Sequence, residues 1–137
     1  MKVPTHIFTF LKFDAMHCHI FVTVSCEAIA DPSNIIIDVR SEEEWDKGHL
    51  GCAHLLPLST NFTEEHLEAL TDGNKNTTIL IHCGKKHIRA AEAVKNATEW
   101  GYTNVTSAGG YKEIVEAGCS CAGKSSEKYL MYKLLEF

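Results

Sequence analysis

One cysteine stands where its neighbours could make it a nucleophile. Cys83 is followed by a run of cationic or potentially cationic side chains, Lys85, Lys86, His87 and Arg89. Positive charge beside a cysteine favours the thiolate over the thiol, and the thiolate is the reactive form. We therefore predict that Cys83 acts as a nucleophile on a substrate that is itself an anion.

The elements expected around Cys83 would support this chemistry. The apolar run Thr77–Cys83 predicts a buried strand, and the Ala-rich stretch Arg89–Trp100 predicts the clearest helix of the chain. The loop between them could turn its backbone N–H groups toward the sulfur, and the helix would point its positive end at the same place. A structural alternative stays open, in which Cys83 merely ends a buried strand and Lys85–His87 is a solvated loop.

Segments rich in β-branched residues alternate with helical segments along the chain. The expected strands cover 20–24, 35–40, 53–56, 77–83 and a short stretch around Val105, and the expected helices cover 25–30, 41–48, 63–70, 89–100, 110–117 and 125–137. Ser41 and Glu44 form a capping-box pattern. The alternation predicts an α/β fold with a mostly parallel five-stranded sheet flanked by helices. Ligands bind at the carboxyl ends of such strands, which points to the loops after Asp38–Arg40 and Cys83.

Composition limits the class of protein. A chain of 137 residues has room for one domain with one core. The formal net charge of −5 gives no broad cationic field, so we expect no nucleic-acid partner. The sequence has no run of about eighteen apolar residues, so we expect no membrane span. We also expect no cofactor and no metal, because His17-Cys18-His19 with Cys26 fits no common zinc-ligand spacing.

The other cysteines are expected to be mostly free thiols in a reducing compartment. The six cysteines are irregularly spaced, and the chain is not a short disulfide-dense one. We interpret Cys26 and Cys52 as packing residues. Cys119 and Cys121 are either incidental or resolve an oxidised Cys83. A cytoplasmic protein is therefore expected, with a degenerate secretory leader at the N-terminus as the alternative.

Several separated motifs occur in order along the chain. They are Ile35–Trp45, Gly48–Leu50, Ala53–Pro57, the Cys83 loop, Gly101–Val105 and Ala108–Tyr111. Together they resemble a rhodanese domain, most of all the small single-domain, phage-shock-type rhodaneses. The resemblance covers about residues 20–118, and it leaves an N-terminal extension over 1–19 and a C-terminal helical extension over 119–137.

The resemblance implies a sulfurtransferase that works through a persulfide on Cys83. The thiolate would take the outer sulfur of thiosulfate or a similar small anionic donor, and a thiol or cyanide would accept it. Asp38 and Arg40 match a pair near the loop, to which we assign a structural role in bracing the end of the sheet. The oligomeric state stays open. The backbone N–H groups that would hold the substrate belong to Gly84, Lys85, Lys86, His87, Ile88 and Arg89.

The loop departs from the family pattern in ways that leave two alternatives. Lys86 stands where such loops usually have Gly, and the spacing His82-Cys83-x5-Arg89 resembles that of cysteine-dependent phosphatases and arsenate reductases of the same fold. Arg89 could then clamp two oxygens of a tetrahedral anion, although Ala90 replaces the Ser or Thr that usually follows it. In the other alternative the domain is a non-catalytic binding module, and the altered loop is a docking surface.

Overall fold

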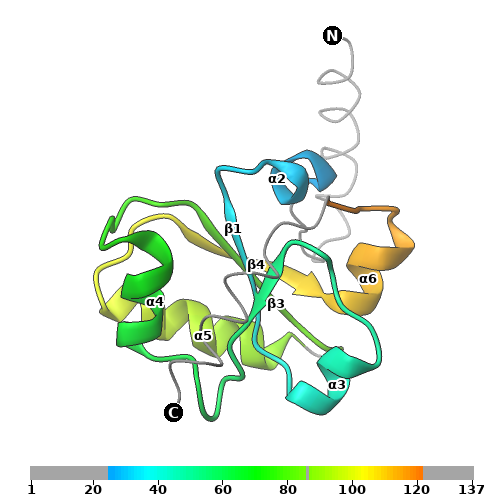
Figure 1. Cartoon of the computed structure of the whole chain (residues 1–137), viewed down its shortest axis with the longest axis horizontal. Helices are drawn as coiled ribbons and strands as arrows, with labels where there is room; N and C mark the ends of the chain where they lie inside the picture. Colours follow the sequence, from blue (N-terminus) through cyan, green and yellow to red (C-terminus); the bar gives the residue numbers. More distant parts are fainter. Residues whose placement is uncertain (1–24, 86, 122–137) are drawn as a thin grey trace, which may run out of the picture.

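The computed structural model describes residues 25–85 and 87–121, which form a β-sheet with helices on both faces (Figure 1). The expected α/β fold with a parallel sheet is confirmed. The described part of the chain has four strands and not five, in the order β2-β1-β3-β4. The expected strand over 20–24, the expected helix over 125–137 and the expected extension over 1–19 lie outside the described residues. The strands are β1 Ile35–Asp38, β2 Ala53–Leu55, β3 Ile79–Cys83 and β4 Val105–Gly110.

The helices pack on the two faces of the sheet. One face is covered by α4 (Glu64–Thr71) and α5 (Ile88–Glu99), and the other by α2 (Cys26–Ala30), α3 (Glu42–Asp46) and α6 (Tyr111–Glu116). In Figure 1, α4 lies to the left of the strands, and α3 and α6 lie to the right. Each face of the sheet has its own apolar core, and successive side chains of β1 point to opposite faces. Ile37 packs in the core under α4 and α5, and Ile36 packs in the core under α2, α3 and α6.

Polar side chains at the helix starts explain where three helices begin. Ser25 and Thr63 accept hydrogen bonds from backbone N–H groups in the first turns of α2 and α4. At α3, Ser41 Oγ accepts from the Glu44 N–H at 3.1 Å, and Glu44 Oε1 accepts from the Ser41 N–H at 3.0 Å. The capping box expected from the sequence is therefore confirmed, and it fixes the Glu44 carboxylate at the start of α3.

The strand order brings the ends of three strands to one edge of the sheet. β1 lies beside β3, with Asp38 paired to His82. β4 pairs with β3 through an irregularity after Ile81, and beyond it Cys83 lies opposite Gly110. The loops that follow β1, β3 and β4 therefore meet, which is where ligands bind in parallel sheets.

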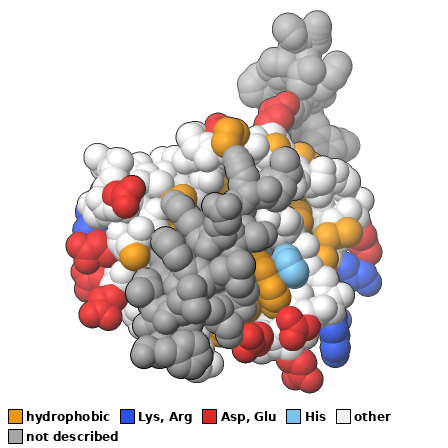
Figure 2. Space-filling view, in the orientation of Figure 1, with side chains coloured by type: hydrophobic (Ala, Val, Ile, Leu, Met, Phe, Trp, Pro, Cys, Tyr) orange, Lys and Arg blue, Asp and Glu red, His pale blue; other side chains and the backbone are white. Residues whose placement is uncertain are grey.

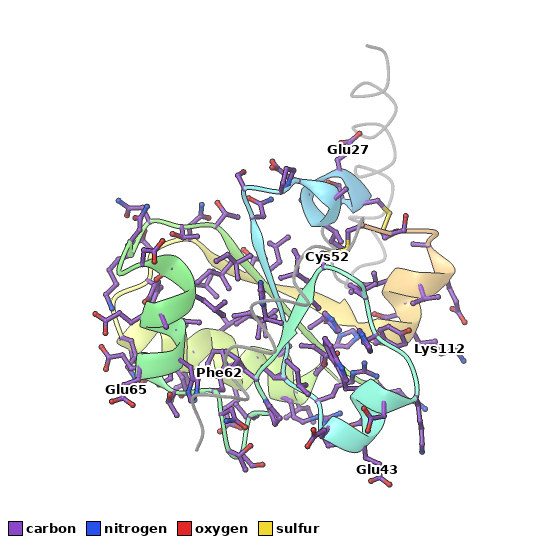
Figure 3. The ribbon with its side chains drawn as sticks, viewed as in Figure 1. Glu27, Glu43, Cys52, Phe62, Glu65 and Lys112 are labelled. Carbon is purple, nitrogen blue, oxygen red and sulfur yellow. A yellow bond between two sulfur atoms is a disulfide. The ribbon has the colours of Figure 1, made fainter. Side chains whose placement is uncertain are left out.

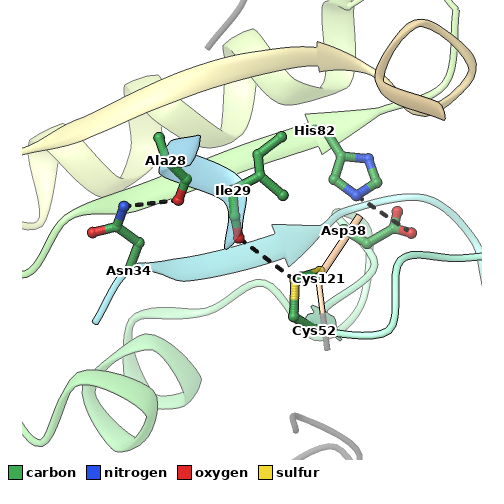
Figure 4. The surroundings of a disulfide bond; sticks show 7 residues. All are labelled: Ala28, Ile29, Asn34, Asp38, Cys52, His82 and Cys121. Carbon is green, nitrogen blue, oxygen red and sulfur yellow. Dashed lines mark hydrogen bonds and ion pairs between the residues drawn. A yellow bond between two sulfur atoms is a disulfide. The ribbon is translucent and has the colours of Figure 1, made fainter. Parts of the chain in front are cut away.

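Two disulfides tie the chain after α6 to the face that carries α2. Cys26 is bonded to Cys119, and Cys52 is bonded to Cys121 (Figures 3 and 4). The expectation of free thiols is wrong for these four residues, and the suggested resolving role of Cys119 and Cys121 is wrong with it. The partners are 93 and 69 residues apart in sequence and meet only in the folded chain, so their spacing gave no sign of the pairing. Among the described residues, Cys83 is the free cysteine.

Acidic side chains gather on the surface over α4 and beside α3 (Figure 2). The whole chain has 18 Asp and Glu against 13 Lys and Arg, a formal net charge of −5. The cationic side chains that follow Cys83 are therefore a local feature of an acidic protein. In the two described ranges, no helix has the length and apolar character needed to cross a membrane.

Candidate active site

Cys83 ends β3 at the wall of a pocket of about 700 Å³. The residue is buried, with 1% of its surface exposed. The Ala90 N–H, in the first turn of α5, donates a hydrogen bond to Cys83 Sγ at 3.3 Å. Because the N-terminal end of a helix carries partial positive charge, this geometry suits a sulfur that carries negative charge.

The structure brings most of the predicted site residues together around this pocket. Asp38 does not line the pocket but is hydrogen-bonded to Arg40, which does. Lys86 lies outside the described residues. The predicted residues that line the pocket are Arg40, Cys83, Gly84, Lys85, His87, Ile88 and Arg89.

The loop after Cys83 is held by contacts with β4 and α6. The carbonyl oxygen of Gly84 occupies the space that a Cβ atom of residue 110 would need. His87 takes a left-handed conformation, with φ of 60°, immediately before α5, and its Nε2 lies 2.9 Å from Glu113 Oε1. The same oxygen accepts the Gly110 N–H at 3.2 Å. Glu113 therefore links the loop, the end of β4 and α6.

Arg89 points toward α3 and does not form the clamp of the phosphatase alternative. α5 begins at Ile88, so Arg89 lies in the first helical turn. Its Nη1 and Nη2 donate to Glu44 Oε1 and Oε2 at 2.8 and 3.1 Å. Both terminal nitrogens of the guanidinium are thus engaged by one carboxylate at the rim of the pocket.

This ion pair changes the acidity of both groups. The hydrogen bonds from Arg89, helped by the N–H and hydroxyl of Ser41, lower the pKa of Glu44 from 4.5 to about 2 in spite of its partial burial. Glu44 in turn raises the pKa of Arg89. The pair therefore stays charged through the physiological pH range.

Asp38 and Arg40 form a buried ion pair beside the pocket. Arg40 Nε donates to Asp38 Oδ1 at 2.9 Å, and Arg40 Nη2 donates to Asp38 Oδ2 at 2.8 Å. Nη2 also donates to the carbonyl of Gly48 at 2.8 Å, and the guanidinium lies 4.3 Å from the centroid of the Tyr111 ring. These contacts tie the end of β1 to the turn after α3 and to α6. The bracing role assigned from the sequence stays a prediction.

His82 lies fully buried beneath the site, between β1 and α6. Its Nε2 is 3.9 Å from Asp38 Oδ2 (Figure 4), and its ring stacks near Tyr111 with centroids 6.1 Å apart. Burial lowers the pKa of His82, and the attraction of Asp38 opposes this only in part. The imidazole is therefore neutral at physiological pH.

Some residues of the site were not predicted from the sequence. Glu44, Tyr111 and Lys112 also line the pocket. The capping box marked Glu44 as a helix-start residue only, since nothing local shows that it meets Arg89. The pair Gly109-Gly110 before an expected helix was the sequence signal for a third loop at this edge of the sheet. Tyr111 and Lys112 follow directly, at the start of α6.

The metal candidate considered from the sequence lies only in part within the described residues. Cys26 is taken up by its disulfide, and His17-Cys18-His19 lies outside the described residues. Across 25–85 and 87–121, no group of three His, Cys, Asp or Glu side chains is placed to hold a metal ion.

Comparisons with known proteins place the chain among related domains. Thiosulfate sulfurtransferase PspE of Escherichia coli is 35% identical over 78 residues, which are 57% of this chain and 71% of PspE. A solved rhodanese with anions from E. coli is 31% identical, with a TM-score of 0.53 over 59% of this chain and 91% of that one. A solution structure of a Helicobacter pylori protein is 28% identical, with a TM-score of 0.55 over 71% of this chain and 84% of that one.

The family match agrees with the fold and with the place of the pocket. Residues 26–117 match the rhodanese-like domain, and this range runs from α2 to the end of α6. Every residue that lines the pocket lies within it. The resemblance noted in the sequence is confirmed, and the chain belongs to the rhodanese-like domain family.

Proposed function

We propose that the protein is a sulfurtransferase that moves a sulfane sulfur from thiosulfate, or a similar small anionic donor, to a thiol or cyanide. The observation that carries the proposal is the position of Cys83 Sγ at the pocket wall, with the Ala90 N–H donating to it at 3.3 Å. The name of PspE, a thiosulfate sulfurtransferase, supports the same class of reaction.

The first step loads the sulfur onto Cys83. The thiolate attacks the outer sulfur of thiosulfate, a new S–S bond forms, and the original S–S bond breaks. Sulfite leaves with the bonding electron pair, and Cys83 becomes a persulfide with negative charge on its outer sulfur. Backbone N–H groups at the start of α5 are suited to stabilise this charge, as the hydrogen bond from Ala90 to Sγ indicates.

The second step passes the sulfur on. A thiolate or cyanide attacks the outer sulfur, the persulfide S–S bond breaks, and the electron pair returns to Cys83 Sγ. The products are an acceptor persulfide or thiocyanate and the original thiolate. Lys85 and Lys112 at the pocket would favour anionic donors and acceptors through their charge.

The two alternatives have less support from the site. An oxyanion enzyme would use Arg89 to hold its substrate, and here Glu44 engages both terminal nitrogens of Arg89. A binding module without catalysis would not need a negatively charged sulfur, so it does not account for the hydrogen bond from the Ala90 N–H to Cys83 Sγ.

The test is to treat the full chain with thiosulfate, without reductant, and to measure its mass. We expect one added sulfur atom, mapped to the Cys83 peptide and removed by cyanide as thiocyanate. Cys83→Ser should gain no sulfur, and Val115→Ala, an exposed change on α6, should behave as wild type.

Other outcomes would overturn the proposal. Folded protein that gains no sulfur at Cys83 contradicts it. Hydrolysis of an aryl phosphate that disappears in Arg89→Ala would support the oxyanion enzyme instead. Alkylation of Cys83 at the rate of an ordinary thiol at pH 7, with no sulfur transfer, would support the binding module.

We also propose that the protein works in an oxidising compartment and not in the cytoplasm. Its two disulfides support this, because such bonds persist in oxidising environments and are rare in the cytosol. Alkylation of thiols in intact cells before lysis should leave Cys26, Cys52, Cys119 and Cys121 unlabelled. Complete labelling of these four would place the protein in a reducing compartment.

A further inference from the structure

We propose that Glu44 sets the anion specificity of the Cys83 pocket by holding Arg89 at the rim, where its guanidinium does not clamp the oxygens of an anion in the pocket. Glu44 is in this sense a positioning residue that acts through Arg89. The inference deepens the proposed function and rests on it for the nature of the substrate, but it concerns which anions the pocket admits.

The starting point is that Arg89 is already beside the nucleophile. It belongs to the first turn of α5, where the next residue, Ala90, donates its N–H to Cys83 Sγ. Its Nη2 lies only 2.7 Å from where a Cβ atom of residue 84 would stand. The guanidinium therefore lies over Gly84, at the rim of the pocket that Arg89 lines, and we expect rotation about its side-chain bonds to turn it inward.

Glu44 is built to prevent that rotation. Its two carboxylate oxygens accept from the two Nη atoms of Arg89 at 2.8 and 3.1 Å. The carboxylate is itself fixed by the capping box, because Oε1 also accepts the Ser41 N–H at 3.0 Å. A fixed acceptor holds the planar guanidinium more strictly than a mobile one would.

The consequence for ligands follows from hydrogen-bond geometry. A guanidinium offers two parallel donors that match two oxygens of phosphate, arsenate or sulfate. While Glu44 occupies those donors, such an anion must displace a carboxylate that is already bonded twice. Thiosulfate is a tetrahedral anion too, but its outer sulfur can bind at the backbone N–H groups near Cys83 without the guanidinium, whereas phosphate, arsenate and sulfate have no such sulfur atom.

The test measures how well inorganic phosphate protects Cys83 from iodoacetamide, read at the Cys83 peptide by mass spectrometry. Glu44→Gln is the informative variant, because glutamine keeps the capping-box acceptor but loses the charge that holds Arg89. We expect half-protection at a phosphate concentration about fivefold lower than in wild type, since an ion pair this exposed is a modest barrier.

Two controls separate the mechanism from a simple change of charge. Glu43→Gln removes the same charge from the same helix, but Glu43 points outward from α3 (Figure 3), so phosphate protection should stay at the wild-type value. Glu44→Gln/Arg89→Ala should be protected no better than Arg89→Ala alone. Glu44→Asp, which keeps the charge on a shorter stem, should lie between wild type and Glu44→Gln.

Either of two results overturns the inference. Phosphate protection in Glu44→Gln that equals wild type would show that Arg89 is not held back by Glu44. A gain that survives in Glu44→Gln/Arg89→Ala would show that Glu44 acts by direct repulsion of the anion. Because alkylation needs no sulfur transfer, these results are separate from the thiosulfate test, and thermal unfolding of each variant shows whether it is folded.

Discussion

The carbonyl of Gly84 lies against Gly110, in the space that a side chain at position 110 would fill. One glycine belongs to the loop after Cys83 and the other ends β4, opposite Cys83 in the sheet register. This close approach lets the loop that follows Cys83 lie on the end of β4. The fit leaves no room for adjustment, because both contacting groups are backbone.

Gly110→Ala should therefore damage both stability and the site. We expect a loss of about 1 to 3 kcal/mol in the free energy of unfolding, as for other overpacked positions, together with a loss of sulfur loading on Cys83. Gly84→Ala is the comparison, because its Cβ would meet the ends of the Arg89 and Glu44 side chains and no backbone atom, and should cost less. Urea unfolding measures both, and equal stability of the two variants would contradict the prediction.

Arg40→Ala should be strongly destabilising. It would leave the fully buried carboxylate of Asp38 without the guanidinium that bonds it at 2.8 Å, and broken buried pairs typically cost about 3–5 kcal/mol. The double change Asp38→Asn/Arg40→Leu should recover part of the loss, because no charge is then left alone. Denaturant unfolding decides the matter, and an Arg40→Ala protein within about 1 kcal/mol of wild type would be the opposite result.

His82 should make the fold sensitive to mild acid. Burial lowers its pKa in the folded protein, whereas in the unfolded chain it titrates near the ordinary value of about 6.5. The unfolded state therefore takes up the proton first, so stability is unaffected above this value and falls as the pH drops below it. The fall between pH 7.5 and pH 5 should be smaller in His82→Gln. Parallel stability curves for the two proteins would exclude this role of His82.

Reduction should weaken the fold through the two disulfides. A disulfide typically contributes about 2–4 kcal/mol by restricting the unfolded chain, and both bonds here close long segments. We expect a lower melting temperature in the presence of a phosphine reductant. A variant with serine at positions 26, 52, 119 and 121 should melt at that lower temperature with or without reductant. A wild-type protein that melts alike in both conditions would show that these bonds contribute little.

Local pattern was enough to find the layers of the fold and the place of the site. The apolar run that ends at Cys83 and the alternation of strands and helices predicted the parallel sheet and pointed to the edge where the pocket lies. The capping box at Ser41 and Glu44 was also predicted, since it depends on residues three positions apart. The start of α5 was missed by one residue, because His87 takes a left-handed conformation that its residue type does not require.

The parts that could not be predicted depend on contacts between distant segments. Arg89 and Glu44 are 45 residues apart in sequence. Whether Arg89 turns into the loop or pairs with Glu44 depends on how the folded chain brings the two together. The disulfides could not be predicted for the same reason, because Cys119 and Cys121 meet their partners, on α2 and just before β2, only in the folded chain. The spacing of these residues along the sequence does not indicate the ion pair or the disulfides.

Both cross-links have one end beyond the limit of the family match. The match stops at residue 117, whereas the sulfur atoms that close the two covalent rings from the C-terminal side belong to Cys119 and Cys121. A shortened chain that stopped at Ala117 would keep every residue that lines the pocket and would lose both disulfides. Work on the chain cut back to its family match would therefore examine the pocket without the two covalent cross-links.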